Sequence, residues 1–238
     1  DDVQDRKEDL TMKVQLPLMV IAMGLALPAN AQQMGDEKVN LALPGISFTR
    51  SLNQAARSAK VEGGMISLAS EGGRDNFRDP DGKLSNNTAP VLLAEVDNAK
   101  SWTLSGLVTP SFNATYDAGT FYIWVDDAHW LKMAMERDER GRVRIVSVRT
   151  NDTSDDNNHD VVTAPNVWMK ISSDTKTVGF YYSTDQKSWQ LIRLFKNDYP
   201  QKLWVGVSAQ SPQGKGSVTQ FRDLTLTKTS ISDFRLGL

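Results

Sequence analysis

The sequence predicts an all-β fold, a sandwich or jelly roll of nine or more strands. Short runs of strand-forming residues, separated by turn residues such as Arg140-Gly141, follow one another from Met65 onward. No stretch of this region has a sustained helical period, and only Ser51–Val61 is predicted to form a short helix. The content of 39% hydrophobic and 24% charged residues argues against disorder, fibrous repeats and a multi-span membrane protein.

The N-terminal region has the features of a secretory signal peptide. Met12 and Lys13 precede an apolar run from Leu16 to Leu27, and Ala29-Asn30-Ala31 supplies the cleavage site. A membrane anchor is the alternative, but the run is shorter than the span of about 20 residues that an anchor needs. We therefore expect residues 12–31 to be a signal peptide and residues 1–11 to be an upstream extension or an expression remnant. The mature chain would begin at Gln32 as a secreted or periplasmic protein without membrane insertion.

The mature chain is expected to contain an N-terminal segment over residues 32–63 and one sandwich domain over residues 64–238. A chain of this size buries enough surface for a core without disulfides, and the sequence contains no cysteine. The predicted strands lie at Ser101–Val108, Thr120–Asp126, Trp130–Arg137, Arg142–Thr150, Val167–Ser172, Thr177–Ser183, Ser188–Phe195, Leu203–Gln210 and Ser217–Leu226.

Side chains alternate between two faces along these strands. One face is aliphatic and is predicted to point into the core, with Met133, Met135, Val205 and Val207 among its members. The other face mixes aromatic rings with polar groups, a combination that suits carbohydrate, because flat rings stack on pyranose faces. The alternative is that these aromatics pack beneath loops or a second layer of the domain. The candidate ligand-binding residues are Tyr122, Trp124, Trp130, Lys132, Glu136 and Gln210 on this face, with Asp155, Asp156 and Asn157 in a loop at its rim.

An ordered series of motifs runs through the second half of the chain. Thr115-Tyr116-Asp117-Ala118-Gly119 precedes His129-Trp130-Leu131-Lys132, Ser154-Asp155-Asp156-Asn157 and Ala209-Gln210-Ser211-Pro212-Gln213-Gly214, and Asp75, Phe77 and Asp79-Pro80 lie upstream. This order resembles a concanavalin A-like family of unknown function whose members are sometimes described as "regulation of enolase" proteins. The resemblance covers about Gly64 to Leu238. It implies a concanavalin A-like jelly-roll β-sandwich, related to legume lectins and laminarinase-type glucanases, and implies no activity.

Catalysis is the main alternative to simple binding. Glycosidases use paired carboxylates, and the nearest arrangement in this sequence is Glu136-Arg137-Asp138-Glu139. Because Asp138 and Glu139 run into the turn at Arg140-Gly141, we expect only Glu136 to stay on the strand, ion-paired with Lys132. A glycoside hydrolase or lyase would use Glu136 with an acidic partner from the loop. A further alternative is a protein–protein interaction module of the cell envelope that uses the same aromatic face.

Charge and composition exclude several classes of function. The 27 basic and 29 acidic residues leave a net charge of −2, which predicts neither a nucleic-acid partner nor binding to an anionic membrane surface. The absence of cysteine excludes thiolate metal sites and cysteine nucleophiles. No cofactor is expected, although the acidic loop Asp152–Asp160 leaves calcium open, with Asp155, Asp156 and Asn157 as oxygen ligands. A solvated loop whose side chains cap their own backbone is the alternative.

Overall fold

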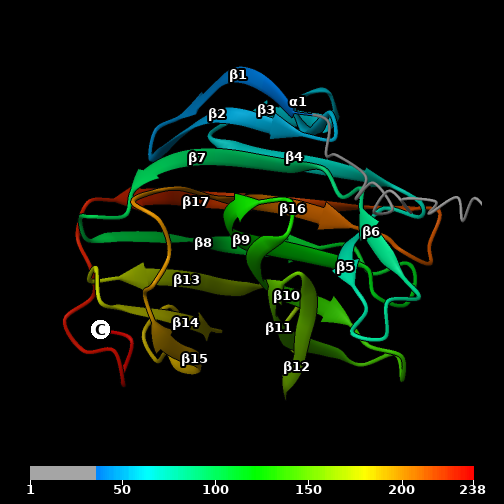
Figure 1. Cartoon of the computed structure of the whole chain (residues 1–238). Coiled ribbons are helices and arrows are strands. Elements are labelled where there is room, and N and C mark those ends of the chain that lie inside the picture. The colour runs from blue at the N-terminus through cyan, green and yellow to red at the C-terminus, as the bar shows by residue number, and fades with distance from the viewer. Residues whose placement is uncertain (1–35) are drawn as a thin grey trace, which may run out of the picture. The chain divides into compact units, whose positions relative to one another are not determined.

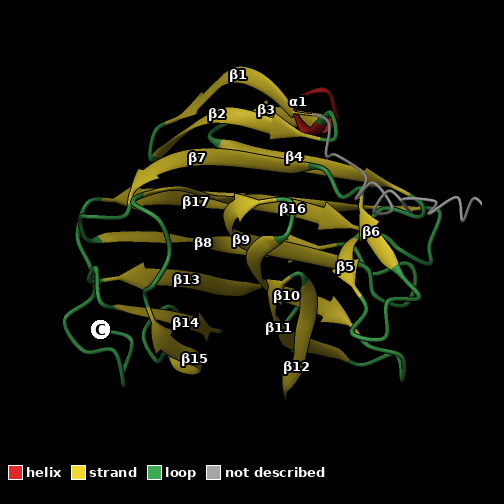
Figure 2. Cartoon of the chain, in the orientation of Figure 1, coloured by secondary structure: helices red, strands yellow, loops and turns green. Residues whose placement is uncertain are grey.

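The computed structural model describes residues 36–238, and the predicted signal peptide at residues 12–31 lies outside them. The described residues form two antiparallel sheets, of eight and seven strands, and a separate two-stranded hairpin. The two sheets pack face to face (Figure 1), and strands make up nearly all of the regular structure (Figure 2). The predicted all-β sandwich is confirmed. Among the described residues, no helix has the length and apolar character that a membrane span requires.

The strands are numbered in chain order, which differs from their spatial order within each sheet. From one edge to the other, the eight-stranded sheet contains β1 (Asp36–Leu43), β2 (Ile46–Leu52), β7 (Val91–Asp97), β16 (Lys202–Gln210), β9 (Ala118–Asp126), β10 (His129–Arg137), β11 (Val143–Asn151) and β12 (Thr153–Val161). The seven-stranded sheet contains β15 (Gln190–Lys196), β14 (Thr177–Ser183), β13 (Val167–Ser173), β8 (Trp102–Pro110), β17 (Gly216–Thr227), β4 (Met65–Glu71) and β3 (Ala59–Glu62). The hairpin pairs β5 (Asn76–Arg78) with β6 (Ser85–Asn87), and α1 (Ala55–Ser58) is a single helical turn.

All nine predicted strands are present, with ends that differ by at most two residues. Strand β7 was not predicted because it is apolar on both faces and therefore lacks alternation. Leu92 and Ala94 belong to the core between the sheets, whereas Val91 and Leu93 belong to a second apolar cluster on the outer face. A strand that is covered on both sides loses the alternating pattern that marks a half-exposed one.

Two local predictions are wrong. The predicted acidic loop Asp152–Asp160 is mostly strand β12, which pairs with β11 through its backbone at the edge of the eight-stranded sheet. Its polar side chains gave no strand pattern, and polar, charged residues are common on edge strands because they discourage further pairing. The predicted helix Ser51–Val61 is reduced to α1, since β2 ends at Leu52 and β3 begins at Ala59.

The main core lies between the two sheets. Met133, Met135, Val205 and Val207 are fully buried there, as predicted from alternation. Phe121 of β9 and Phe221 of β17 stack across the two layers, with ring centroids 6.4 Å apart. This packing fixes which face of each strand points outward, and it therefore decides which side chains can reach the outer surface of the eight-stranded sheet.

Candidate ligand-binding site

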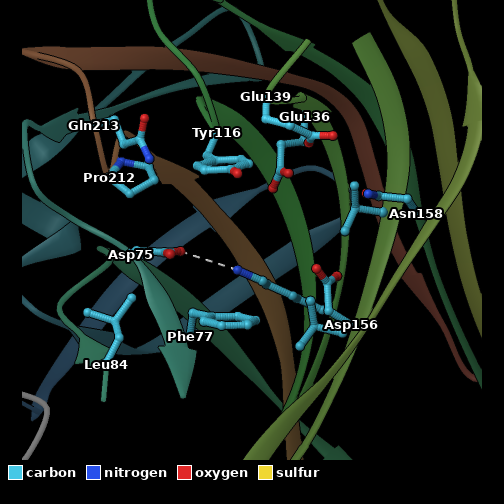
Figure 3. Close-up of a pocket in the computed structure, with 13 residues that line it drawn as sticks. Asp75, Phe77, Leu84, Tyr116, Glu136, Glu139, Asp156, Asn158, Pro212 and Gln213 are labelled. Carbon is cyan, nitrogen blue, oxygen red and sulfur yellow. Dashed lines mark hydrogen bonds and ion pairs between the residues drawn. The ribbon is translucent and has the colours of Figure 1, made fainter. Parts of the chain in front are cut away.

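A cavity of about 500 Å³ lies on the outer face of the eight-stranded sheet, over β10, β11 and β12 (Figure 3). Lys132 of β10, Val148 of β11 and Asp156 of β12 are directly opposite one another in the strand register, so they form one row across its floor. The sheet supplies Lys132, Glu136, Val146, Val148, Asp156 and Asn158 to the cavity. A volume of this size is typical of small-molecule sites.

The hairpin β5–β6 forms one wall of the cavity and supplies Phe77. The backbone N–H of Arg78 donates to Ser154 Oγ of β12 at 2.9 Å, and Asn76 Nδ2 donates to Tyr122 Oη of β9 at 3.1 Å. These two bonds anchor the hairpin to opposite sides of the sheet face. Asp75 and Leu84, which flank the two strands of the hairpin, also line the cavity.

The opposite wall is formed by two loops that Asp117 ties together. The carboxylate of Asp117 accepts hydrogen bonds from the backbone N–H groups of Asn113 and Ala114, and from Ser211 Oγ at 2.7 Å. These bonds hold the loop before β9 against the loop after β16. Tyr116 from the first loop, and Pro212 and Gln213 from the second, therefore line the cavity together, with Glu139 from the β10–β11 turn.

Lys132 is the buried cation of the site. Its Nζ donates to Asp75 Oδ1 at 3.2 Å, to the backbone oxygen of Asn76 at 2.8 Å and to Gln210 Oε1 at 3.0 Å. Burial alone would lower the pKa of Lys132, but the charges of Asp75, Tyr122 and Glu136 and the hydrogen bond to Asp75 together outweigh burial and raise it. Lys132 is therefore charged at neutral pH, and its three donors are already used within the protein.

Glu136 does not form the predicted ion pair with Lys132, so that prediction is wrong. Lys132 pairs with Asp75 instead, and no residue in the described part of the chain forms a hydrogen bond or an ion pair with the Glu136 carboxylate. Burial, together with the charges of Asp75, Asp156 and Glu139, raises the pKa of Glu136 to about 8, although Lys132 opposes this shift. Burial also raises the pKa of Asp156. Two carboxyl groups without an ion-pair partner thus face the cavity.

The prediction that the aromatic side chains of the outer face form an exposed binding surface is wrong. Tyr122, Trp124 and Trp130 lie on the outer face, but they are fully buried beneath the hairpin and form a second apolar cluster. The planes of Trp124 and Trp130 differ by only 3°, with centroids 6.4 Å apart. Gln210 is also buried, and its Nε2 donates to Tyr122 Oη at 2.6 Å. These four residues support the cavity from below, and the face that an interaction module would have used is covered.

The predicted rim residues divide between two faces of β12. Asp156 lines the cavity, whereas Asp155 and Asn157, its neighbours along an extended strand, point to the other face. The three oxygen ligands therefore do not converge on one ion. Within residues 36–238, no group of three or more histidine, aspartate or glutamate side chains is arranged to hold a metal.

Residues that sequence analysis did not place in the site form most of its walls. Phe77, Tyr116 and Gln213 are the main ones, and each lies within a motif that carried the family resemblance. The motif positions were therefore a usable signal. Alternation along strands gave no signal for these three side chains, because they come from a short hairpin and from loops.

Comparison with known proteins identifies the family. The sequence profile of a family described as "Protein of unknown function (DUF1349)" matches residues 52–229. The chain belongs to the DUF1349 family. It is also 26% identical, over 72% of its length and 85% of the relative's, to "Regulation of enolase protein 1" of Saccharomyces cerevisiae. The family resemblance read from the motifs is confirmed.

Solved structures show the same fold. A crystal structure of a functionally unknown protein from Saccharomyces cerevisiae has a TM-score of 0.68 and 26% identity, covering 75% of this chain and 95% of that one. The GH43 protein BlXynB from Bacillus licheniformis, as a K247S mutant, has a TM-score of 0.61 and 14% identity, covering 80% of this chain and 38% of that one. The DUF1349 chain thus shares the two-sheet antiparallel sandwich of these proteins, and the GH43 likeness extends to fold alone.

Proposed function

We propose that this DUF1349 protein binds carbohydrate in the cavity over β10–β12 and does not turn it over. One observation carries this proposal: the cavity combines two aromatic rings with polar side chains that lack partners within the described part of the protein. Saccharides present apolar ring faces together with many hydroxyl groups, so their sites need both kinds of surface.

Phe77 and Tyr116 provide the apolar part of the proposed site. They come from different walls and, in the view of Figure 3, lie above and below the level of Asp75. Val146 and Val148 add an aliphatic floor between the walls. A pyranose ring that enters this space would remove water from these surfaces, and such burial is the main source of affinity for an apolar face.

The polar side chains provide the specificity. In the described structure, the side chains of Glu136, Asn158 and Gln213 make no hydrogen bond to another residue, although all three line the cavity. Hydroxyl groups of a bound sugar would pair with them. A ligand that lacked the matching hydroxyl would leave such a group unpaired, at a cost of about 1–3 kcal/mol.

The test of this proposal is a pair of substitutions at Tyr116. A glycan array with the mature chain would identify a ligand, and titration would then compare variants. Tyr116→Ala should weaken binding about tenfold or more, the size of a 1.4 kcal/mol loss, because it removes one aromatic wall. Tyr116→Phe keeps the ring and should bind within about threefold of the wild type. Equal affinity for the wild type and Tyr116→Ala would contradict the proposed site.

A glycoside hydrolase is the second candidate, and the state of Glu136 favours it. A carboxyl group whose pKa is raised to about 8 is protonated at neutral pH, as a general acid must be, and Asp156 supplies a second carboxylate in the same cavity. We expect the wild type to release no reducing ends from polysaccharides. If the wild type does release reducing ends, and if Glu136→Gln abolishes this release while the variant stays folded, the hydrolase would replace the binding proposal.

A further inference from the structure

We infer that the saccharide bound in this cavity carries a free ammonium group, as an unacetylated amino sugar does, and that Glu136 and Asp156 receive this group. The inference rests on the proposed carbohydrate site and names its ligand class. It follows from the charges that line the cavity and from which of them already have partners.

The cavity contains more acidic groups than the protein pairs with cations. Its lining includes Asp75, Glu136, Glu139 and Asp156, against the single cation Lys132. Lys132 is paired with Asp75 at 3.2 Å, and Glu139 has Arg140 at 3.8 Å. No ion pair to Glu136 or Asp156 occurs among residues 36–238. A neutral sugar would leave Asp156 without an ion-pair partner and Glu136 mostly protonated.

Glu136 and Asp156 project into the cavity from different strands, and the charge of Asp156 contributes to the raised pKa of Glu136. Glu136 lies on β10 and Asp156 on β12, with β11 between them, and both side chains project from the outer face of the sheet. In Figure 3 the carboxyl groups of Glu136 and Asp156 both point into the cavity. An ammonium group with three donors in this space would hydrogen-bond to both, and such charge-assisted bonds are stronger than neutral ones.

The walls of the cavity favour a ring over a flexible chain. Phe77 and Tyr116 present flat surfaces, and Val146, Val148 and Pro212 add rigid apolar contacts. A linear polyamine would meet the charge requirement, but it would lose conformational freedom on binding and fill these surfaces poorly. A cyclic sugar with one ammonium group meets both requirements.

The experiment compares three probes by titration calorimetry at pH 7. The β-1,4-linked disaccharide of glucosamine carries ammonium groups, its N-acetylated counterpart is neutral with the same linkage, and spermidine carries charge without a ring. We expect the glucosamine disaccharide to bind at least tenfold more tightly than either other probe. Glu136→Gln and Asp156→Asn should each remove about tenfold of that affinity. Asp155→Asn, the same change one residue away on the opposite face of β12, should have no effect.

Proton release provides a second readout. The groups around Glu136 are the acids Asp75, Glu139 and Asp156, the phenol of Tyr116 and the cation Lys132. Because the pKa of Glu136 is about 8 in the free protein, its carboxyl group is mostly protonated at pH 7, and a bound ammonium group would lower that pKa. Binding should therefore release a proton, which buffers of different ionisation enthalpy detect, and Glu136→Gln should abolish the release.

The outcomes separate this inference from the proposed function. If the protein prefers the acetylated disaccharide, or if it binds another neutral sugar more tightly and that binding depends on Tyr116, the ammonium inference is overturned. The proposed carbohydrate binding would then remain intact. If spermidine binds as tightly as the glucosamine disaccharide, the assignment of the ligand as a saccharide is overturned. Full affinity of Glu136→Gln and Asp156→Asn for the glucosamine disaccharide would overturn the assigned residues.

Discussion

Replacing Trp124 with alanine should lower the free energy of unfolding by about 3–5 kcal/mol, the range for removing a large aromatic side chain from a core. Trp124 is fully buried, stacks on Trp130 and lies 6.5 Å from the ring of Tyr122. Its removal would leave a cavity beneath the β5–β6 hairpin. Because the hairpin forms one wall of the site, the same variant should also lose ligand affinity.

Trp204 provides the matched control. It lies directly opposite Trp124 on the neighbouring strand β16, but it is only partly buried and contacts the outer cluster from its margin. Trp204→Ala should therefore cost much less in stability than Trp124→Ala. Chemical denaturation followed by circular dichroism would measure both variants. Equal losses would show that the hairpin does not bury Trp124 in solution.

Trp124→Phe would separate packing from hydrogen bonding. The indole N–H groups of Trp124 and Trp130 are buried and have no hydrogen-bond partner in the described structure. Removing such a donor relieves a desolvation cost of about 1–3 kcal/mol, which offsets part of the lost ring volume. We therefore expect Trp124→Phe to be much milder than Trp124→Ala.

The fold was readable from the sequence because most strands keep one face between the sheets. Met133, Met135, Val205 and Val207 alternate with outer residues, and their burial matches that alternation. Strands without alternation were missed, for two different reasons. Strand β7 is apolar on both faces, whereas β12 is polar on both and is held by backbone pairing with β11.

The candidate site was only partly readable, because alternation assigns a face and does not show what covers it. Trp124 and Trp130 were correctly placed on the outer face, yet the β5–β6 hairpin turns that part of the face into a second core. Short hairpins of three-residue strands carry no periodic signal. Lys132 and Glu136 were found because they lie on a long alternating strand, and Asp156 because it belongs to an acidic motif that was predicted as a loop. Phe77 and Tyr116 come from segments that only the family motifs marked.

Replacing Lys132 with methionine should lower the free energy of unfolding by about 3–5 kcal/mol, because it leaves a buried carboxylate without its partner. The side chains of Lys132 and Asp75 are only 4% and 15% exposed, so water can replace the lost ion pair only in part. The backbone oxygen of Asn76 and Gln210 Oε1 would lose a donor at the same time. Methionine matches the length of the lysine stem, so packing should change little.

Two controls identify the ion pair as the cause. Adding Asp75→Asn to Lys132→Met should recover part of the stability, since the asparagine oxygen still accepts the backbone N–H of Asn76 while the buried charge is gone. Lys202→Met breaks an exposed pair with Glu95 of the same 3.2 Å length, and it should cost less than about 1 kcal/mol. A loss at Lys132 as small as that at Lys202, measured by denaturant unfolding, would contradict a buried ion pair.

The loss at Lys132 should also grow as pH rises above about 8. Burial raises the pKa of Glu136 to about 8 in the folded protein, above its ordinary value of 4.5, and Lys132 is the charge that opposes this shift. A carboxyl group whose pKa is raised by folding stabilises the fold least once pH passes through that pKa. Without Lys132 the pKa of Glu136 rises further, so above about pH 8 the wild type ionises Glu136 while the folded variant keeps it protonated. Only the variant then continues to lose stability as pH rises. A loss that is independent of pH would show that Lys132 acts through packing rather than through its charge.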